Sequence, residues 1–204
     1  MIAIIDYGVG NLFSLYSSLK SVGQDAVVAS DAATIKGCEK LLLPGVGAFA
    51  DASAMLRAKG LDGLVKSEAR DGKALLGVCL GMQMLFEKSY EFGEHDGLGL
   101  LPGIVAPIKP RIPAGYKIPH IGWNALRFPA GGKSPLFRYI SEGDHVYFVH
   151  SFQAEQCADS TIATVEYGAG LTAAVGRGNI FGTQFHPEKS GEVGLNILRA
   201  FAEM

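Results

Sequence analysis

Short aliphatic runs alternate with amphipathic segments through the first half of the chain. Four runs have the length and composition of buried strands: Ile2–Ile5, Ala26–Ala29, Leu41–Leu43 and Ala74–Val78. Apolar residues recur at helical spacing in the segments between and after them: Asn11–Val22, Phe49–Ala58, Leu61–Ala69 and Leu80–Lys88. This alternation is typical of an α/β fold, in which an open, mostly parallel twisted sheet carries helices on both faces.

The pattern changes between Gly93 and Ala130. Glycine and proline are frequent there, and no long helical pattern is present. We expect this region to be a small, partly antiparallel insertion, with a strand at Ile104–Ile108 and a loop or turn at Pro119–Asn124.

The last third of the chain returns to regular patterns. It predicts strands at Val146–Val149 and Ile180–Phe185, and a hairpin formed by Thr161–Tyr167 and Thr172–Gly176. A closing helix is expected at Gly194–Glu203. Because no repeat, low-complexity segment or flexible linker interrupts the chain, we expect residues 1–204 to form a single domain.

Composition and charge exclude several classes of function. The chain has 204 residues, of which 48% are hydrophobic and 19% charged, and its formal net charge is −2. No broad electrostatic footprint for nucleic acid is therefore expected. No apolar run approaches the length of a membrane span, and the opening MIAIIDYGVG lacks the basic region and cleavage site of a signal peptide.

The cysteines and glycine-rich turns predict neither a metal nor a cofactor. Cys38, Cys79 and Cys157 are odd in number and far apart, which suggests no disulfide framework and no zinc site. A reduced, cytoplasmic setting fits them best. The turn after Ile5 resembles a dinucleotide fingerprint, but Phe13 occupies the place of its third glycine.

Candidate chemistry begins at Cys79, between a predicted strand and a predicted helix. Gly77 and Gly81 flank it at two residues on either side, which is the pattern of a nucleophile elbow with cysteine in place of serine. Glycine removes the Cβ atoms that would clash in such a sharp turn. The N–H groups at the start of the next helix favour the thiolate, and the N–H of Leu80 is placed to hold an oxyanion. A buried structural cysteine is the alternative interpretation.

His186 and Glu188 complete a candidate catalytic set. Pro187 favours an extended backbone at His186, and in an extended chain positions i and i+2 point the same way. Glu188 can therefore accept a hydrogen bond from one imidazole nitrogen of His186, leaving the other for Cys79. These residues supply a nucleophile, a base and an orienting carboxylate.

Four polar or glycine-rich groups follow predicted strands. They are Pro44-Gly45-Val46-Gly47, Cys79, His150-Ser151-Phe152 and His186-Pro187-Glu188. Ligands bind at the carboxyl ends of the strands in an open parallel sheet, so we expect these groups to share one rim. Beside a thiolate, the N–H groups of Val46 and Gly47 would complete an oxyanion hole. His150 is interpreted as a hydrogen-bonded structural residue rather than a second base.

GVCLGMQ followed far downstream by HPE resembles the class I, triad-type glutamine amidotransferases. Within that class, five stretches together resemble the glutaminase subunits of imidazole glycerol phosphate synthase: DYGVGNLFS, PGVGAF, PHIGWN, YFVHSF and GTQFHPEKS. The likeness runs from Asp6 to the closing helix. DYGVGN and PHIGWN are its more specific parts, since many amidotransferases share the triad motif.

The resemblance implies hydrolysis of L-glutamine through a γ-glutamyl thioester on Cys79, with His186 moving the proton. It implies a glutamine pocket lined by six residues: Gly45, Gly47, Gln83, Glu91, Ser151 and Phe152. The family often has tyrosine where this chain has Phe152, so the aromatic wall is expected without a hydroxyl. Ammonia would pass to a (β/α)8-barrel synthase subunit in histidine biosynthesis, forming a heterodimer. Asn11, Trp123 and Lys189 would then lie at the interface.

Two other functions remain open at this point. The first is the same chemistry for a different client, as in the glutaminase subunit of pyridoxal phosphate synthase; PHIGWN and DYGVGN argue against it. The second is a non-catalytic regulatory or redox-binding protein with a reactive cysteine. The joint presence of Cys79, His186 and Glu188 argues against that interpretation.

Overall fold

A computed structural model describes all residues from Met1 to Met204. Its largest feature is a nine-stranded sheet in the order β2-β1-β3-β4-β13-β12-β11-β8-β9. The first five of these strands run parallel: β2 (Ala26–Ala29), β1 (Ile2–Ile5), β3 (Lys40–Leu43), β4 (Ala74–Val78) and β13 (Ile180–Thr183). The other four pair antiparallel: β12 (Gly170–Arg177), β11 (Thr161–Glu166), β8 (His120–Arg127) and β9 (His145–His150). The sheet is therefore mixed, with β13 at the change of direction.

Helices cover both faces of the parallel half, as predicted. Alternation of side chains along β1 sends Ala3 and Ile5 to one face and Ile2 and Ile4 to the other. The first face packs against α2 (Ala32–Gly37), α3 (Phe49–Ala58) and α4 (Leu61–Arg70). The second packs against α1 (Leu12–Ser21) and α6 (Gly191–Ala202). Each face is closed by its own cluster of buried apolar side chains.

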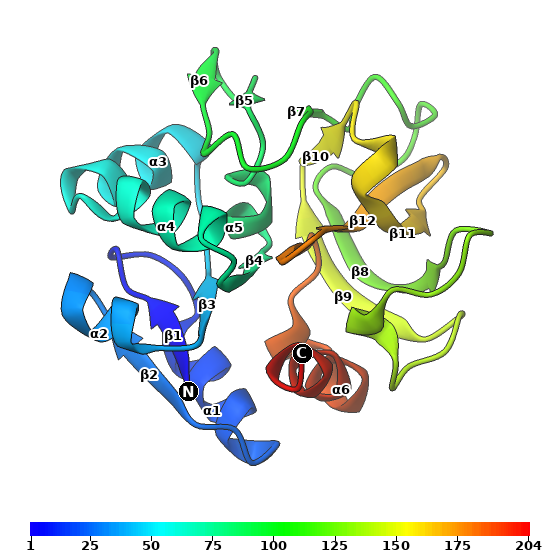
Figure 1. The fold of residues 1–204 in the computed structure, drawn as a ribbon. Helices are drawn as coiled ribbons and strands as arrows, with labels where there is room; N and C mark the ends of the chain where they lie inside the picture. The colour runs from blue at the N-terminus through cyan, green and yellow to red at the C-terminus, as the bar shows by residue number, and fades with distance from the viewer.

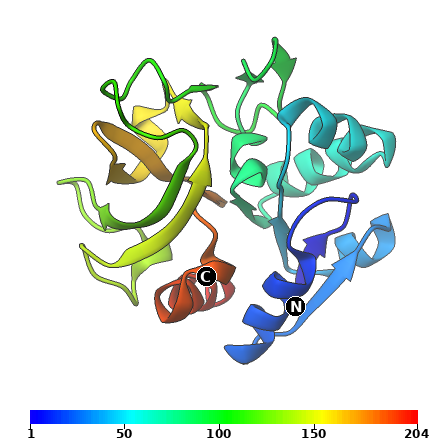
Figure 2. The same ribbon diagram turned by 180° about the vertical axis from the view of Figure 1, so that it is seen from behind.

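The antiparallel strands form a second half of the molecule, which lies beside the parallel half (Figure 1; Figure 2 shows it from behind). They are not confined to the small insertion that the sequence predicted. A second, four-stranded sheet borders it, in the order β10 (Phe152–Glu155), β7 (Ile104–Pro107), β5 (Lys88–Ser89) and β6 (His95–Asp96). The remaining elements are three short 3₁₀ turns: η1 (Pro135–Phe137), η2 (Ala158–Ser160) and η3 (Pro187–Lys189). The antiparallel region is therefore longer than the insertion predicted at residues 93–130, because antiparallel pairing continues to residue 183.

The expectation of a loop at Pro119–Asn124 was wrong. The segment enters β8, which runs from His120 to Arg127 and pairs with β9 from His120↔His150 to Ala125↔His145. A glycine and a preceding proline made it read as a turn. Pairing overrides those signals because Gly122, at φ 148°, is accommodated within the ladder.

The helix expected over Leu80–Lys88 is also shorter than predicted. Helix α5 covers only Leu80–Gln83. The backbone carbonyls of Met84, Leu85 and Phe86 accept hydrogen bonds from a passing segment, residues 98–101, instead of from the next helical turn. Tertiary hydrogen bonding therefore ends a helix that the composition favoured.

Two helical glycines provide a test of this packing. A Cβ on Gly194 of α6 would lie 1.9 Å from the carbonyl oxygen of Pro187, whereas a Cβ on Gly63 of α4 meets nothing within 4 Å. We expect Gly194→Ala to lower the free energy of unfolding by about 1–3 kcal/mol through overpacking. Gly63→Ala should raise it by about 0.5–1 kcal/mol. Urea denaturation of both variants measures this, and a stabilising Gly194→Ala would contradict the close contact.

Candidate active site

Cys79 sits on a strained turn at the end of β4. Its backbone has φ 55° and ψ −111°, a conformation that costs a non-glycine residue about 1–3 kcal/mol. The neighbouring glycines are needed by sterics: a Cβ on Gly81 would lie 1.9 Å from the oxygen of Leu43, and one on Gly77 would lie 2.6 Å from the oxygen of Gly81. The turn lifts the sulfur out of the sheet, into the position of an attacking group.

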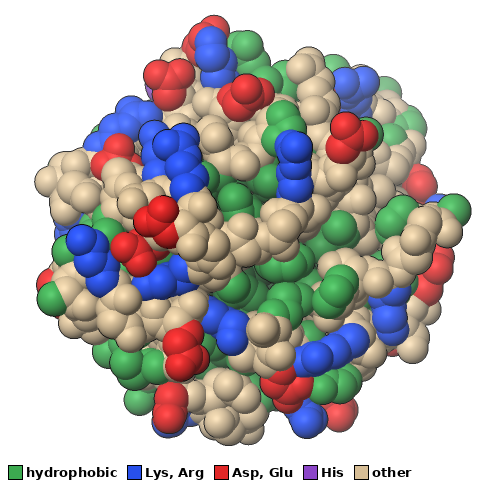
Figure 3. Space-filling view, in the orientation of Figure 1, with side chains coloured by type: hydrophobic (Ala, Val, Ile, Leu, Met, Phe, Trp, Pro, Cys, Tyr) green, Lys and Arg blue, Asp and Glu red, His purple; other side chains and the backbone are tan.

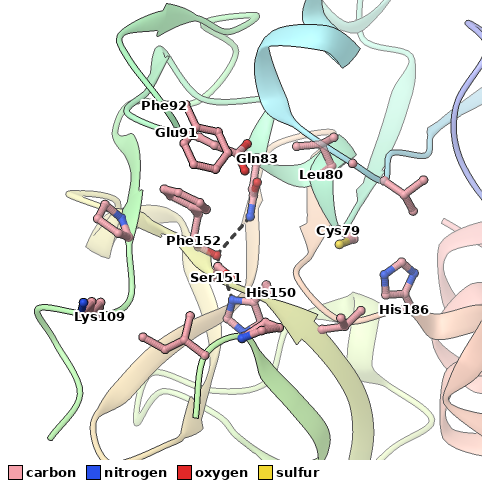
Figure 4. A pocket seen from close by; sticks show the side chains of 16 residues that line it. Cys79, Leu80, Gln83, Glu91, Phe92, Lys109, His150, Ser151, Phe152 and His186 are labelled. Atoms are coloured by element: carbon pink, nitrogen blue, oxygen red, sulfur yellow. Dashed lines mark hydrogen bonds between the residues drawn. The ribbon is translucent and has the colours of Figure 1, made fainter. Parts of the chain in front are cut away.

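His186 and Glu188 are brought to Cys79 by β13, the parallel neighbour of β4. Thr183 pairs with Val78, and the N–H of Cys79 donates to the oxygen of Thr183 at 2.7 Å. Nδ1 of His186 lies 2.8 Å from Oε1 of Glu188. The imidazole lies beside Cys79 on the wall of the same cavity (Figure 4). The structure thus brings the three predicted residues together, with His186 between Glu188 and Cys79 as the sequence predicted.

Within the set Cys79, His186 and Glu188, each charged side chain stabilises the charged form of its neighbour. Burial alone lowers the pKa of His186, but hydrogen bonds to Cys79 and Glu188, and the charges of both, raise that pKa to about 9. Burial alone raises the pKa of Glu188, but its hydrogen bond to His186, the charge on His186 and a bond from Asn11 hold it below its ordinary value. The imidazolium and the carboxylate are both stabilised, as an imidazolium–thiolate pair requires.

The segment after β3 lies over the cysteine. Val46 and Gly47 line the cavity, and neither of their N–H groups donates to a protein acceptor. The preceding carbonyl, that of Pro44, accepts a hydrogen bond from the hydroxyl of Tyr7 at 2.7 Å. Burial, with the nearby Cys79, raises the pKa of Tyr7, so the hydroxyl stays protonated as a donor. Tyr7 was not predicted, although it stands in the DYGVG turn directly after β1.

The cavity beside Cys79 has a volume of about 580 Å³. The predicted pocket residues Gly47, Gln83, Glu91, Ser151 and Phe152 all line it, together with Cys79, Leu80 and His186. Gly45 does not; it lies beneath, where a Cβ would be 2.6 Å from the N of Gly81. Phe92 and Lys109 line the cavity without having been predicted there, and His150, which was expected at the same rim, lines it too (Figure 4).

Glu91 and Phe92 line the end of the cavity that lies away from His186 (Figure 4). Oε2 of Glu91 accepts from the N–H of Phe49 at 2.6 Å, at the start of α3. Phe92 stands 88% exposed at φ 54°, and its ring meets that of Phe152 edge-on at 6.2 Å. The cavity therefore has a carboxylate and an aromatic wall at the end away from His186 (Figure 4).

His150 is a structural residue, as its sequence context indicated. Its Nδ1 lies 2.8 Å from the oxygen of Phe152, and its Nε2 lies 3.0 Å from Nδ1 of His120. Burial lowers its pKa to about 4. A neutral imidazole with both nitrogens engaged holds the Phe152 backbone and does not act as a base.

The three residues expected at an interface lie beside the site. The Nδ2 of Asn11 donates to Oε1 of Glu188 at 2.8 Å, so this side chain also positions the carboxylate. Trp123 is 52% exposed and meets Tyr147 edge-on at 6.0 Å. The Nζ of Lys189 lies 5.9 Å from the centroid of the Tyr147 ring. Trp123 and Lys189 thus flank the same tyrosine.

The face of the molecule seen in Figure 3 carries side chains of mixed character. Hydrophobic side chains gather near the middle of the face in Figure 3, and charges of both signs are spread around its margin. None of the helices is long and apolar enough to cross a membrane.

Comparison with known proteins gives one family throughout. The sequence model of the family of class I glutamine amidotransferases matches residues 3–204 of the chain. The chain is 49% identical over 205 residues to the imidazole glycerol phosphate synthase subunit HisH of Caldanaerobacter subterraneus subsp. tengcongensis, covering 100% of this chain and 98% of that one. It is 47% identical to the protein of the same name from Wolinella succinogenes, covering 100% of each.

Solved structures with low sequence identity share the fold. A glutamine amidotransferase crystal structure matches with a TM-score of 0.76 at 20% identity, covering 100% of both chains. The structure of PurLQS from Thermotoga maritima matches with a TM-score of 0.73 at 21% identity, covering 99% of this chain and 97% of that one. At these identities the likeness concerns the fold alone.

The raised pKa of His186 predicts a pH-dependent stability. Between its ordinary value near 6.5 and about 9, His186 holds more of its proton in the native state than in the unfolded chain, so its contribution to stability falls as pH rises through this window. Glu188→Gln removes a charge that raises this pKa and should flatten the fall. Urea denaturation of both proteins at about pH 6.5 and about pH 9 measures the difference. Equal pH slopes in wild type and variant would contradict the coupling.

Proposed function

Because the chain belongs to the class I glutamine amidotransferases, and within them to the family of HisH subunits, we propose that it is the glutaminase subunit of an imidazole glycerol phosphate synthase. It hydrolyses L-glutamine to glutamate and ammonia for histidine biosynthesis. The observation that carries the proposal is the presence of Cys79 and His186 on the wall of one cavity, with the buried carboxylate of Glu188 hydrogen-bonded to His186. The full chain, 1–204, is proposed to act as one amidotransferase domain.

The reaction begins with Cys79. Its thiolate attacks the side-chain amide carbon of glutamine, forming a C–S bond and placing negative charge on the amide oxygen. The imidazolium of His186 gives its proton to the amide nitrogen, the C–N bond breaks, and ammonia leaves. A γ-glutamyl thioester remains on the sulfur. His186, now neutral, takes a proton from water, whose oxygen attacks the thioester and releases glutamate.

Negative charge on the oxygen is stabilised by backbone N–H groups. Leu80 supplies one, and the segment of Val46 and Gly47 supplies another. A donor of this kind contributes about 3–4 kcal/mol to the stability of the transition state. Glycine at 47, with φ 94°, lets the peptide unit after Val46 reorient at low steric cost. The proposed second donor is therefore conditional on the conformation of this segment.

Recognition of glutamine is assigned to the far end of the cavity. The carboxylate of Glu91 faces the α-ammonium group, and the Ser151–Phe152 segment lies along the substrate. The Phe152 and Phe92 rings form the apolar wall. Gly45 supports the turn from below and is not assigned a contact with substrate.

The partner proposed to receive ammonia is a (β/α)8-barrel synthase subunit in a heterodimer. Exposed Trp123, with Lys189 and Asn11 beside the triad, supports an interface at this end of the molecule. Direct transfer protects ammonia from protonation in neutral water. No nucleic acid, membrane or bound cofactor takes part in the proposed reaction. Three free, buried cysteines support a cytoplasmic location.

Coupling to the partner gives the test of this function. The substrate proposed for the barrel subunit is an aminoimidazole carboxamide ribonucleotide derivative. We expect the isolated chain to hydrolyse glutamine slowly, and the barrel subunit with this nucleotide bound to accelerate hydrolysis about a hundred- to a thousandfold, since one oxyanion donor has that effect. Steady-state glutaminase assays, with subunit and nucleotide added separately and together, measure it. Cys79→Ser is the control and should abolish hydrolysis in every mixture. Full activity of the lone chain would contradict a conditional oxyanion donor, and no activity in any mixture would contradict the function.

A further inference from the structure

A buried glutamine, Gln184, contacts the reactive sulfur without lining the cavity. It follows β13 directly, one residue beyond the pairing of Thr183 with Val78, and its side chain is fully buried. Its Nε2 lies 3.8 Å from Sγ of Cys79. Gln184 and His186 stand two residues apart in extended chain, so both side chains reach the cysteine from the end of the same strand.

The orientation of this amide is dictated by its neighbours. Gln83 presents one polar atom both to the carbonyl oxygen of Phe152, at 3.1 Å, and to the amide of Gln184, at 2.9 Å. A carbonyl oxygen only accepts, so that atom of Gln83 is the nitrogen. It donates to both, so the Gln184 atom facing it is the oxygen. The NH₂ group of Gln184 is thereby turned toward the sulfur.

We propose that Gln184 is a further catalytic residue, whose amide N–H stabilises the thiolate of Cys79, and that Gln83 is the positioning residue that turns this amide toward the sulfur. The proposal rests on the proposed glutaminase function for its role in turnover. A buried thiolate needs donors, because hydrogen bonds to an anion in a low-dielectric site offset the lost solvation.

Two features make this donor important here. Helix α5 has only four residues, so the field of a long helix is not available to the sulfur. His186 must also give up its proton in the reaction, whereas the amide of Gln184 donates throughout the cycle. The donor therefore remains when the thiolate re-forms as the leaving group of the second step.

The test measures thiolate formation directly, apart from turnover. In Gln184→Met, a side chain of similar size that lacks the donor, we expect the pH midpoint of iodoacetamide alkylation at Cys79 to rise by about one unit, since hydrogen bonds to charged groups are of this strength. Alkylation in a Cys79→Ser variant gives the background from the other cysteines. In Gln184→Leu, a second variant that lacks the donor, the midpoint should also rise.

A matched control separates this effect from lost stability. Gln153 is also buried and bridges two groups, accepting from the N–H of Thr172 at 3.2 Å and donating to Glu155 at 3.1 Å, with no contact to Cys79. Gln153→Met should lose stability without moving the alkylation midpoint. In the complex, Gln184→Met should lower kcat about tenfold and leave KM nearly unchanged.

Two results overturn the proposal. An alkylation midpoint in Gln184→Met equal to that of Gln153→Met would make Gln184 a packing residue only. If Gln184→Met does not fold, an unchanged or lower midpoint in Gln184→Leu has the same meaning. Because alkylation needs no glutamine, these outcomes are independent of the outcome that rejects the function, a wild-type complex that does not hydrolyse glutamine.

Discussion

The close approach of three backbone segments around Gly81 is the constraint on which the site depends. The carbonyl of Leu43, at the end of β3, occupies the space that a side chain on Gly81 would need. Gly77 and Gly45 are crowded against the same turn. This contact holds Cys79 at a positive φ that the chain would otherwise avoid. It also sets the segment with Val46 and Gly47 directly over the sulfur, so strain and oxyanion geometry have one origin.

The place of β13 in the sheet joins the rest of the chemistry to that turn. It is the last parallel strand on one side and the first antiparallel partner on the other. Its end therefore delivers Gln184, His186 and Glu188 beside Cys79. The N–H of His186 also bonds to Tyr147 of β9, at 3.0 Å, which brings the far edge of the sheet back to the site. The cavity forms where the parallel and antiparallel halves of the molecule meet. The candidate interface residues lie near the site because the same hydrogen bond brings the edge strand close to it.

The sequence was sufficient where local pattern and chemistry agree. The four aliphatic runs of the first half became strands, and the glycine-flanked cysteine became a strained turn beside His186. It was insufficient where tertiary hydrogen bonds decide. Helix α5 ends early because residues 98–101 bond the carbonyls of Met84, Leu85 and Phe86, which follow it, and β8 forms through pairing despite Gly122. Gln184 and Tyr7 were missed for a similar reason: their roles depend on which atoms they face, and a buried amide or hydroxyl has no periodic signature.

The central claim is that the strained turn makes Cys79 a covalent nucleophile toward glutamine. Mass spectrometry of the complex, quenched in acid during turnover and digested, tests it most directly. The account predicts a γ-glutamyl group on the peptide that contains Cys79, lost after treatment with hydroxylamine, which cleaves thioesters. In Glu188→Gln the same adduct should remain detectable. Rapid ammonia release with no adduct on Cys79 at any quench time, or activity that persists in Cys79→Ser, would contradict the account.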